Sequence, residues 1–206
     1  MIAIIDYGMG NLRSVEKALA HVGAQAAVTQ DPEVLEKATG VVLPGVGAFA
    51  QAMDNLKAAG LVEPIRRAIA SGKPFLGICL GLQLLFETSE ERFCDDAALP
   101  RGLGIVPGRV RRFPAGPKVP QIGWNTLLFP KATRLFAGVD EGSYVYFVHS
   151  YYAEPADPAV VAAVTEYGIE YCSAVEAGNV MAVQFHPEKS SRVGLQILSN
   201  FAALCR

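Results

Sequence analysis

The chain has 206 residues, of which 51% are hydrophobic and 18% are charged. This length and composition allow a full hydrophobic core and exclude an intrinsically disordered protein. The formal net charge of −2 disfavours a protein whose main partner is nucleic acid or an anionic membrane. No apolar run approaches the roughly 18 residues of a membrane helix, and the N-terminus has no signal-peptide pattern, so we expect a cytoplasmic protein.

The part of the chain before Glu87 alternates short apolar runs with amphipathic stretches. The apolar runs predict strands at 2–5, 26–28, 40–43 and 74–78, and the helical periodicity predicts helices at 14–22, 48–59, 61–71 and 80–86. These strands are apolar along their whole length. We therefore expect an α/β fold with a parallel sheet that is covered on both faces.

The part after Glu87 has a different character, because glycine and proline are scattered through it. Strand-like segments predict hairpins and edge strands at 104–113, 124–128, 144–149, 160–165, 171–177 and 180–185. Ala177-Gly178-Asn179 predicts a hairpin turn, and residues 191–204 have helical periodicity. We find no linker, repeat or low-complexity tract, so we expect one domain over residues 1–206.

Cys79 lies between two glycines, in Gly77-Ile78-Cys79-Leu80-Gly81, where an apolar strand passes into a helix. This is the pattern of a nucleophile elbow, with sulfur in place of the serine oxygen. Such a turn strains the backbone of the central residue, and the glycines avoid collisions between strand and helix. The amino end of the following helix favours a thiolate. A buried structural cysteine beside packing glycines fits the pentapeptide equally well.

The other cysteines are Cys94, Cys172 and Cys205, and their spacing contains no C-x-x-C pair and no nearby histidine. We interpret them as small buried hydrophobic residues in a reducing compartment. The sequence therefore predicts neither a disulfide framework nor a metal site, and no cofactor is implied.

His186 is the best candidate for the base that a cysteine nucleophile needs. It lies in Gln184-Phe185-His186-Pro187-Glu188, directly after an apolar run, and Glu188 is close enough in sequence to hold the imidazole in one tautomer. His21 ends a predicted helix and is expected to be a surface or capping residue. His149 begins a polar cluster at a strand end, where a supporting polar role and a purely structural role are both open.

The segment Pro44-Gly45-Val46-Gly47 follows a buried strand. Its two glycines allow the backbone to approach a ligand closely and to turn N–H groups toward it. With the N–H of Leu80 it makes a plausible oxyanion hole, although an ordinary loop between a strand and a helix would also fit.

Together, P-G-V-G, G-I-C-L-G-x-Q and Q-F-H-P-E resemble the motifs of the class I, triad-type glutamine amidotransferases. This resemblance implies a flavodoxin-like α/β fold with a twisted, mixed, largely parallel sheet between helices. It implies that Cys79 is the nucleophile, His186 the general base and acid, and Glu188 the residue that orients it. It further implies that the oxyanion forms between Leu80 and the backbone of Val46 and Gly47. The implied substrate-binding residues are Gly45, Gly47, Gln83, Glu91, Ser150 and Tyr151.

Four further segments resemble, within that family, the glutaminase subunits of imidazole glycerol phosphate synthase. They are D-Y-G-M-G-N-L-R-S-V from Asp6, P-Q-I-G-W-N from Pro120, Y-F-V-H-S-Y from Tyr146 and H-P-E-K-S from His186. The resemblance implies that glutamine is hydrolysed through a Cys79 thioester and that ammonia passes to a cyclase subunit in a heterodimer. The implied interface residues are Asn11, Trp124, Tyr146 and Lys189.

Some of these residues also have simpler interpretations. Glu91 belongs to an acidic cluster that would ordinarily be a solvated surface, and Lys189 could be an ordinary surface lysine. Trp124 is the only tryptophan, and its loop-like setting fits an aromatic interface anchor. The alternatives for the whole chain are the glutaminase of another class I complex, a non-catalytic relative and a stand-alone cysteine amidohydrolase.

Overall fold

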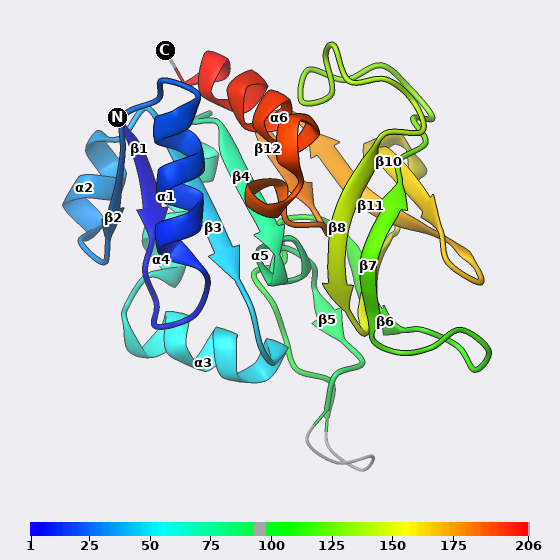
Figure 1. Ribbon diagram of the computed structural model, residues 1–206. Helices are drawn as coiled ribbons and strands as arrows, with labels where there is room; N and C mark the ends of the chain where they lie inside the picture. Colours follow the sequence, from blue (N-terminus) through cyan, green and yellow to red (C-terminus); the bar gives the residue numbers. More distant parts are fainter. Residues whose placement is uncertain (93–97, 206) are drawn as a thin grey trace.

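The computed structural model describes residues 1–92 and 98–205. Its main feature is a mixed sheet of ten strands, accompanied by a separate ribbon of two strands (Figure 1). The strands are β1 (Ile2–Ile5), β2 (Ala26–Thr29), β3 (Gly40–Gly45), β4 (Phe75–Cys79), β5 (Thr88–Ser89), β6 (Gly108–Arg112), β7 (Gln121–Thr126), β8 (Tyr144–His149), β9 (Tyr151–Pro155), β10 (Val161–Glu166), β11 (Glu170–Ala177) and β12 (Val180–Val183).

The helices lie mainly in the first half and at the end of the chain. They are α1 (Leu12–His21), α2 (Pro32–Lys37), α3 (Phe49–Ala58), α4 (Val62–Ala70), α5 (Leu80–Gln83) and α6 (Ser191–Leu204), with 3-10 turns η1 (Pro158–Val160) and η2 (Pro187–Lys189). Within the described residues, none of these helices is both long and apolar enough to cross a bilayer.

The order of the strands divides the sheet into a parallel half and a mostly antiparallel half. The order is β2-β1-β3-β4-β12-β11-β9-β6-β5, with β10 paired to β11. From β2 to β12 all pairs are parallel, whereas β11 runs antiparallel to β12, β9 and β10. The expected α/β fold with a mixed, largely parallel sheet is confirmed.

Two apolar layers enclose the parallel half, because successive strand residues point to opposite faces. Ala3 and Ile5 join the core under α2, α3 and α4, while Ile2 and Ile4 join the core under α1 and α6. The β7–β8 ribbon packs on the second face, where Phe147 lies 5.8 Å from Phe185 between ring centres. Both faces are therefore covered, as the apolar strands predict.

Several predicted boundaries change in the structure. The predicted helix 80–86 is a single turn, α5, followed by the turns of residues 84–86. The strand β9 follows β8 after only Ser150, where the sequence suggests a polar cluster. Trp124 lies inside β7 rather than in a loop, and β7 begins at Gln121. The predicted turn at Gly178 joins β11 to β12, with φ of 60° at the glycine.

Candidate active site

The ends of three neighbouring strands bring the main candidate residues to one edge of the sheet. β4 pairs with β3 on one side and with β12 on the other, in a register that sets Gly45 opposite Cys79 and Val183 opposite Ile78. The loops that follow β3 and β12 therefore flank Cys79. Ligands of open α/β sheets bind at such carboxyl ends of strands.

Cys79 has the backbone conformation that its neighbours predict. Its φ is 55° and its ψ is −107°, a combination that costs a non-glycine residue conformational energy. A Cβ on Gly77 would lie 2.8 Å from the carbonyl oxygen of Gly81, and one on Gly81 would lie 1.8 Å from that of Leu43. Because α5 has only four residues, Cys79 has the first amides of one turn beside it rather than the dipole of a long helix.

His186 and Glu188 form a buried pair on the other side of Cys79. The Nδ1 of His186 donates to Oε1 of Glu188 at 2.8 Å, and their side chains are 2% and 1% exposed. Its Nε2 has no hydrogen-bond partner among residues 1–92 and 98–205. Burial lowers the pKa of His186, but the neighbouring Cys79 and Glu188 outweigh burial and raise that pKa to about 9.

The turn that carries this pair is held at both ends. The hydroxyl of Ser190 donates to the carbonyl oxygen of His186 at 2.6 Å and accepts from the amide of Tyr146 at 3.0 Å. The amide of His186 donates to the carbonyl of Tyr146 at 2.9 Å. A Cβ on Gly194 would lie 1.9 Å from the carbonyl oxygen of Pro187, so α6 packs directly on the turn.

A cavity of about 340 Å³ opens in front of Cys79 and His186. The predicted residues that line it with them are Val46, Gly47, Leu80, Gln83, Glu91, Ser150 and Tyr151. Pro120, Val148 and His149 complete the wall, and sequence reasoning gave none of them a site role except the open one for His149. The predicted oxyanion and substrate residues thus share one space with the predicted nucleophile and base.

Gly45 and Glu188 lie behind this wall rather than in it. A Cβ on Gly45 would lie 2.5 Å from the Tyr7 hydroxyl oxygen, and that hydroxyl donates to the carbonyl of Pro44 at 3.0 Å. Gly45 is therefore required for close packing beneath the loop. Gly47, at φ of 98°, takes a conformation that only glycine adopts readily.

Glu91 is half-buried rather than fully solvated. Its Oε2 accepts from the amide of Phe49 at 2.8 Å, at the first residue of α3. Burial raises the pKa of Glu91, and the hydrogen bond from Phe49 partly opposes the rise. The surface interpretation of this acidic residue is wrong, because the carboxylate anchors a helix start at the rim of the cavity.

The carbonyl groups of Ser150 and Tyr151 are engaged inside the protein. The carbonyl of Ser150 accepts from the amide of Phe113 at 3.3 Å. That of Tyr151 accepts from Nε2 of Gln83 at 3.0 Å and from Nδ1 of His149 at 2.8 Å. Contacts from this segment to a bound molecule would therefore use other atoms.

His149 is a buried polar residue of the cavity wall. Besides Tyr151, it meets the hydroxyl of Tyr171, which lies 3.2 Å from Nε2. Burial is the main cause that lowers its pKa to about 4, and the proximity of His186 lowers it further. The imidazole is therefore neutral near pH 7, which fits a supporting polar role.

Gln184 is a site residue that the sequence analysis did not single out. It is fully buried, accepts from Nε2 of Gln83 at 3.0 Å and lies with its own Nε2 3.7 Å from the sulfur of Cys79. The local signal is a glutamine near the end of an otherwise apolar run, and that run predicts only a strand.

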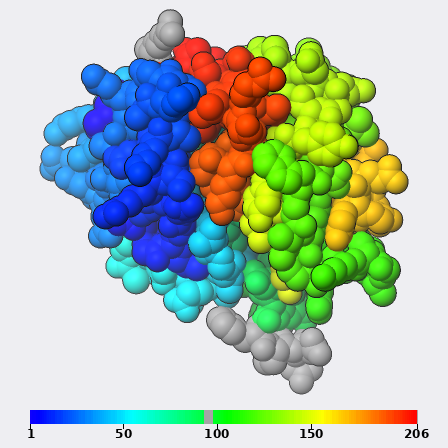
Figure 2. Space-filling model, viewed as in Figure 1, coloured from blue at the N-terminus to red at the C-terminus, as the bar shows by residue number. Residues whose placement is uncertain are grey.

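The four predicted interface residues lie on a surface beside the cavity. Asn11 and Lys189 are exposed, Trp124 is 52% exposed and Tyr146 is half-buried. The ring centres of Trp124 and Tyr146 are 6.1 Å apart, and Nζ of Lys189 lies 5.9 Å from the centre of the Tyr146 ring. The segments that carry them share one face of the molecule: the loop before α1 in blue, β7 in green, β8 in yellow-green and the turn before α6 in orange (Figure 2).

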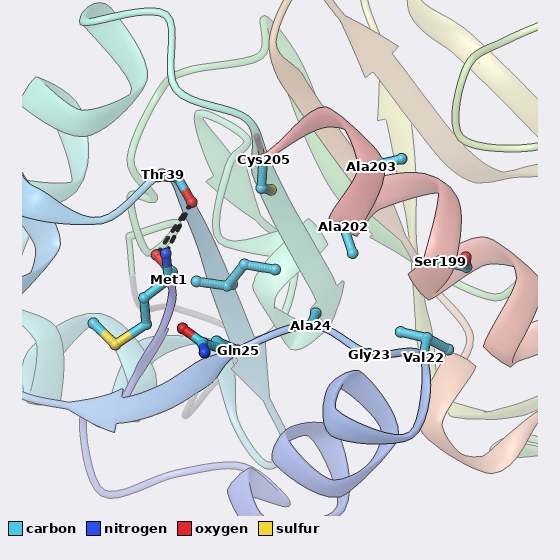
Figure 3. Close-up of a pocket in the computed structure, with 11 residues that line it drawn as sticks. Met1, Val22, Gly23, Ala24, Gln25, Thr39, Ser199, Ala202, Ala203 and Cys205 are labelled. Carbon is cyan, nitrogen blue, oxygen red and sulfur yellow. Dashed lines mark hydrogen bonds between the residues drawn. The ribbon is translucent and has the colours of Figure 1, made fainter.

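A second cavity, of about 220 Å³, lies where the N-terminus meets the end of α6 (Figure 3). The terminal amine of Met1 donates to the hydroxyl of Thr39 at 3.2 Å beside Cys205. Both residues are buried, as predicted, and burial raises the pKa of Cys205 and of Cys172 to about 12. Cys94 lies outside the described residues.

Comparison with known proteins gives one consistent result. The family model "Glutamine amidotransferase class-I" matches residues 3–205. The imidazole glycerol phosphate synthase subunit HisH of Moorella thermoacetica is 55% identical over 205 residues, which is 100% of this chain and 95% of the relative. The same subunit of Syntrophotalea carbinolica is 56% identical over 208 residues and 98% of each chain.

Solved structures agree on the fold. A crystal structure described as a glutamine amidotransferase aligns with a TM-score of 0.76 and 21% identity, over 100% of this chain and 99% of the other. The structure of PurLQS from Thermotoga maritima aligns with a TM-score of 0.75 and 18% identity, over 100% and 98% of the two chains.

Proposed function

The chain belongs to the class I glutamine amidotransferases, among the HisH subunits of imidazole glycerol phosphate synthase, and we propose that Cys79, His186 and Glu188 are its catalytic triad. The observation that carries this proposal is the strained Cys79 at a strand end, with His186 facing the same cavity and Glu188 hydrogen-bonded to His186 from behind the wall. In this arrangement a sulfur nucleophile and a base stand together, with the base held by a third group.

The proposed reaction is hydrolysis of glutamine in two steps. The proton of the Cys79 thiol passes to His186, whose pKa is raised by Cys79 and Glu188 so that it holds that proton, and the sulfur attacks the side-chain amide carbon. His186 then gives the proton to the departing ammonia. A γ-glutamyl thioester remains on Cys79. His186 then takes a proton from water, the resulting hydroxide attacks the thioester, and glutamate leaves while the thiol is restored.

The oxyanion of each tetrahedral intermediate would be held by backbone N–H groups. Leu80 is the first residue of α5, so its amide has no acceptor within the helix, and Val46 and Gly47 line the same cavity. We assign the binding of glutamine to Gln83, Glu91, Gly47 and the Ser150–Tyr151 segment, with Gly45 supporting the loop from behind.

The decisive test is Cys79→Ala in the complex with a candidate cyclase. Synthesis that depends on glutamine should be lost, whereas synthesis from added ammonium should persist, because only ammonia production needs the sulfur. Cys172→Ala is the matched control, since Cys172 is also buried but lies away from the cavity. Equal loss of both syntheses in the Cys79 variant would refute the assignment.

We further propose that a cyclase subunit docks over the surface of Asn11, Trp124, Tyr146 and Lys189, in a heterodimer. The names of the relatives describe them as subunits of a synthase. The proposed surface is supported by its position beside the cavity and by exposed apolar side chains on the outer face of the ribbon, including Ile122 at 62% and Tyr144 at 60% exposure. Ammonia released at Cys79 would then have a short path to the partner.

Trp124→Ala and Lys189→Ala test this surface. Both variants should weaken the complex or raise the ratio of glutamate released to imidazole product above that of the unaltered complex. Lys37→Ala is the control, because Lys37 is an exposed lysine on α2, at the far end of the sheet. Unchanged affinity and stoichiometry in both test variants would place the partner elsewhere.

We propose that residues 1–206 form one domain, since the main sheet draws strands from Ile2 to Val183 and α6 covers it. We also propose a cytoplasmic location, which is supported by the free thiols of Cys79, Cys172 and Cys205.

A further inference from the structure

Gln184 is the first residue after β12 and lies two positions before His186. Its main-chain amide donates to the carbonyl of Ser173 on β11 at 2.8 Å, which fixes the backbone of the residue. Its side chain is fully buried and reaches back across the sheet toward the end of β4. A buried amide side chain requires hydrogen-bond partners, so its surroundings identify its role.

Those partners form a line of hydrogen bonds that ends at the Cys79 sulfur. The Nε2 of Gln83 donates both to the carbonyl of Tyr151 and to Oε1 of Gln184, at 3.0 Å in each case. The Nε2 of Gln184 then donates to Sγ of Cys79 at 3.7 Å.

The direction of this line follows from chemistry. A main-chain carbonyl only accepts, so the Gln83 atom that faces Tyr151 must be its nitrogen. That nitrogen also faces the Gln184 side chain, which must therefore present its oxygen there. The NH₂ group of Gln184 is left on the side of Cys79, and the sulfur can only be its acceptor.

We propose that Gln184 is a further catalytic residue, whose amide N–H orients the Cys79 sulfur and stabilises the thiolate. This proposal rests on the assignment of Cys79 as the nucleophile. A hydrogen bond to the charged form of a group favours that form. His186 can accept the proton, and Gln184 supplies a neutral donor that cannot titrate and so cannot compete for it.

The residue type is also explained by this role. A glutamate at this position would set a carboxylate against the thiolate in a buried space, and a leucine would fill the space without a donor. Gln184→Glu and Gln184→Leu therefore test the donor while nearly keeping the volume.

The experiment measures the rate at which iodoacetamide alkylates Cys79, by mass spectrometry of the Cys79 peptide, at pH 6.5 and pH 9.5. In Gln184→Leu the rate at pH 6.5 should fall about 5-fold, the worth of one hydrogen bond, and should approach that of the unaltered protein at pH 9.5, because alkaline solution favours a thiolate with or without a donor. Gln184→Glu should lose more at pH 6.5.

The control is Gln121→Leu, since Gln121 is another buried glutamine but bonds to Tyr171. It should leave the alkylation of Cys79 unchanged at both values of pH. A purely structural role for Gln184 predicts that the alkylation rate of Cys79 changes equally at pH 6.5 and pH 9.5. An equal change, or no change at all, would overturn the proposal. If circular dichroism shows that Gln184→Leu is unfolded, the alkylation rates of Gln184→Glu at the two pH values provide the test instead.

Iodoacetamide does not resemble glutamine, so this test is independent of the proposed function. If the pH-dependent loss occurs but the unaltered complex releases no glutamate, the role of Gln184 stands and the proposed function fails. If glutamate is released but the loss of alkylation rate is the same at both pH values, the proposed function stands and the role of Gln184 fails.

Discussion

The end of β4 and the outer face of the β7–β8 ribbon differ in what holds their important residues in place. At the end of β4, backbone atoms of neighbouring elements come so close that Gly77 and Gly81 cannot carry a side chain. On the ribbon, Gly123 has nothing within 4 Å of the position of a Cβ, and Trp124 stands half in solvent. The proposed chemistry therefore lies where packing leaves the backbone no freedom, and the proposed docking surface lies where side chains remain exposed.

The largest effect should come from the proposed catalytic pair, His186 and Glu188. His186→Ala should lower glutaminase turnover by up to about 10⁴-fold, and Glu188→Ala should lower it less, because Glu188 only orients and stabilises the imidazole. Turnover by the reconstituted complex is the measurement, with His21→Ala on α1 as the control. A Glu188 variant that is worse than the His186 variant would mean that the two roles are wrongly assigned.

The second prediction concerns stability at the strand end. Gly81→Ala should destabilise the protein by more than about 3 kcal/mol, because the added methyl group meets the Leu43 carbonyl and neither backbone can move freely. Gly178→Ala should lower the free energy of unfolding by only about 1 kcal/mol, because the added methyl group meets no atom and the only penalty is the positive φ of the backbone. Urea unfolding of both variants compares them, and similar costs would show that the strand end is not tightly packed.

The third prediction uses the neutral, buried His149. Its pKa is about 4 in the folded chain, below the ordinary value, so the unfolded chain binds the proton first as pH falls. Stability should therefore decrease as pH falls from 6.5 toward 4, by about 3 kcal/mol from this residue. His149→Gln should remove that part of the dependence. Parallel curves of unfolding free energy against pH for the two proteins would contradict the prediction.

The smallest effect should come from the exposed face of the ribbon. Trp124→Ala should change the unfolding free energy of the isolated subunit by less than about 1 kcal/mol. Phe147→Ala, on the buried face of the same ribbon, should cost about 3 to 5 kcal/mol because it leaves a cavity against Phe185. A large cost at Trp124, measured by the same unfolding experiment, would show that this residue supports the fold rather than a partner.

The strand-end half of the site was accessible from sequence because its signals are local. The run Phe75–Cys79 is apolar throughout and ends between two glycines, so one window of residues contains the strand, the turn and the sulfur. The strand that ends at Gly45 gives a similar local signal, because its apolar run leads directly into a segment with two glycines. The pairing of His186 with Glu188 was predictable for the same reason, since only Pro187 separates them.

The parts that sequence reasoning missed depend on distant partners. Gln83 and Gln184 are 101 positions apart, and nothing near either residue indicates that they meet. β9 was missed because only Ser150 separates it from β8, so no turn residues mark the passage from the ribbon into the main sheet. Glu91 looked solvated because its partner, the amide of Phe49, comes from a helix 42 positions earlier.

The backbone of Cys79, the proposed nucleophile, places stability and catalysis in competition at one residue. Its positive φ would be relaxed in glycine, and a strained conformation of this kind costs about 1 to 3 kcal/mol. A redesign of the chain that optimises stability alone would therefore choose glycine at this position and discard the sulfur. Selection for ammonia production favours the cysteine instead. We therefore expect that a substitution that stabilises the protein at this position also abolishes its activity.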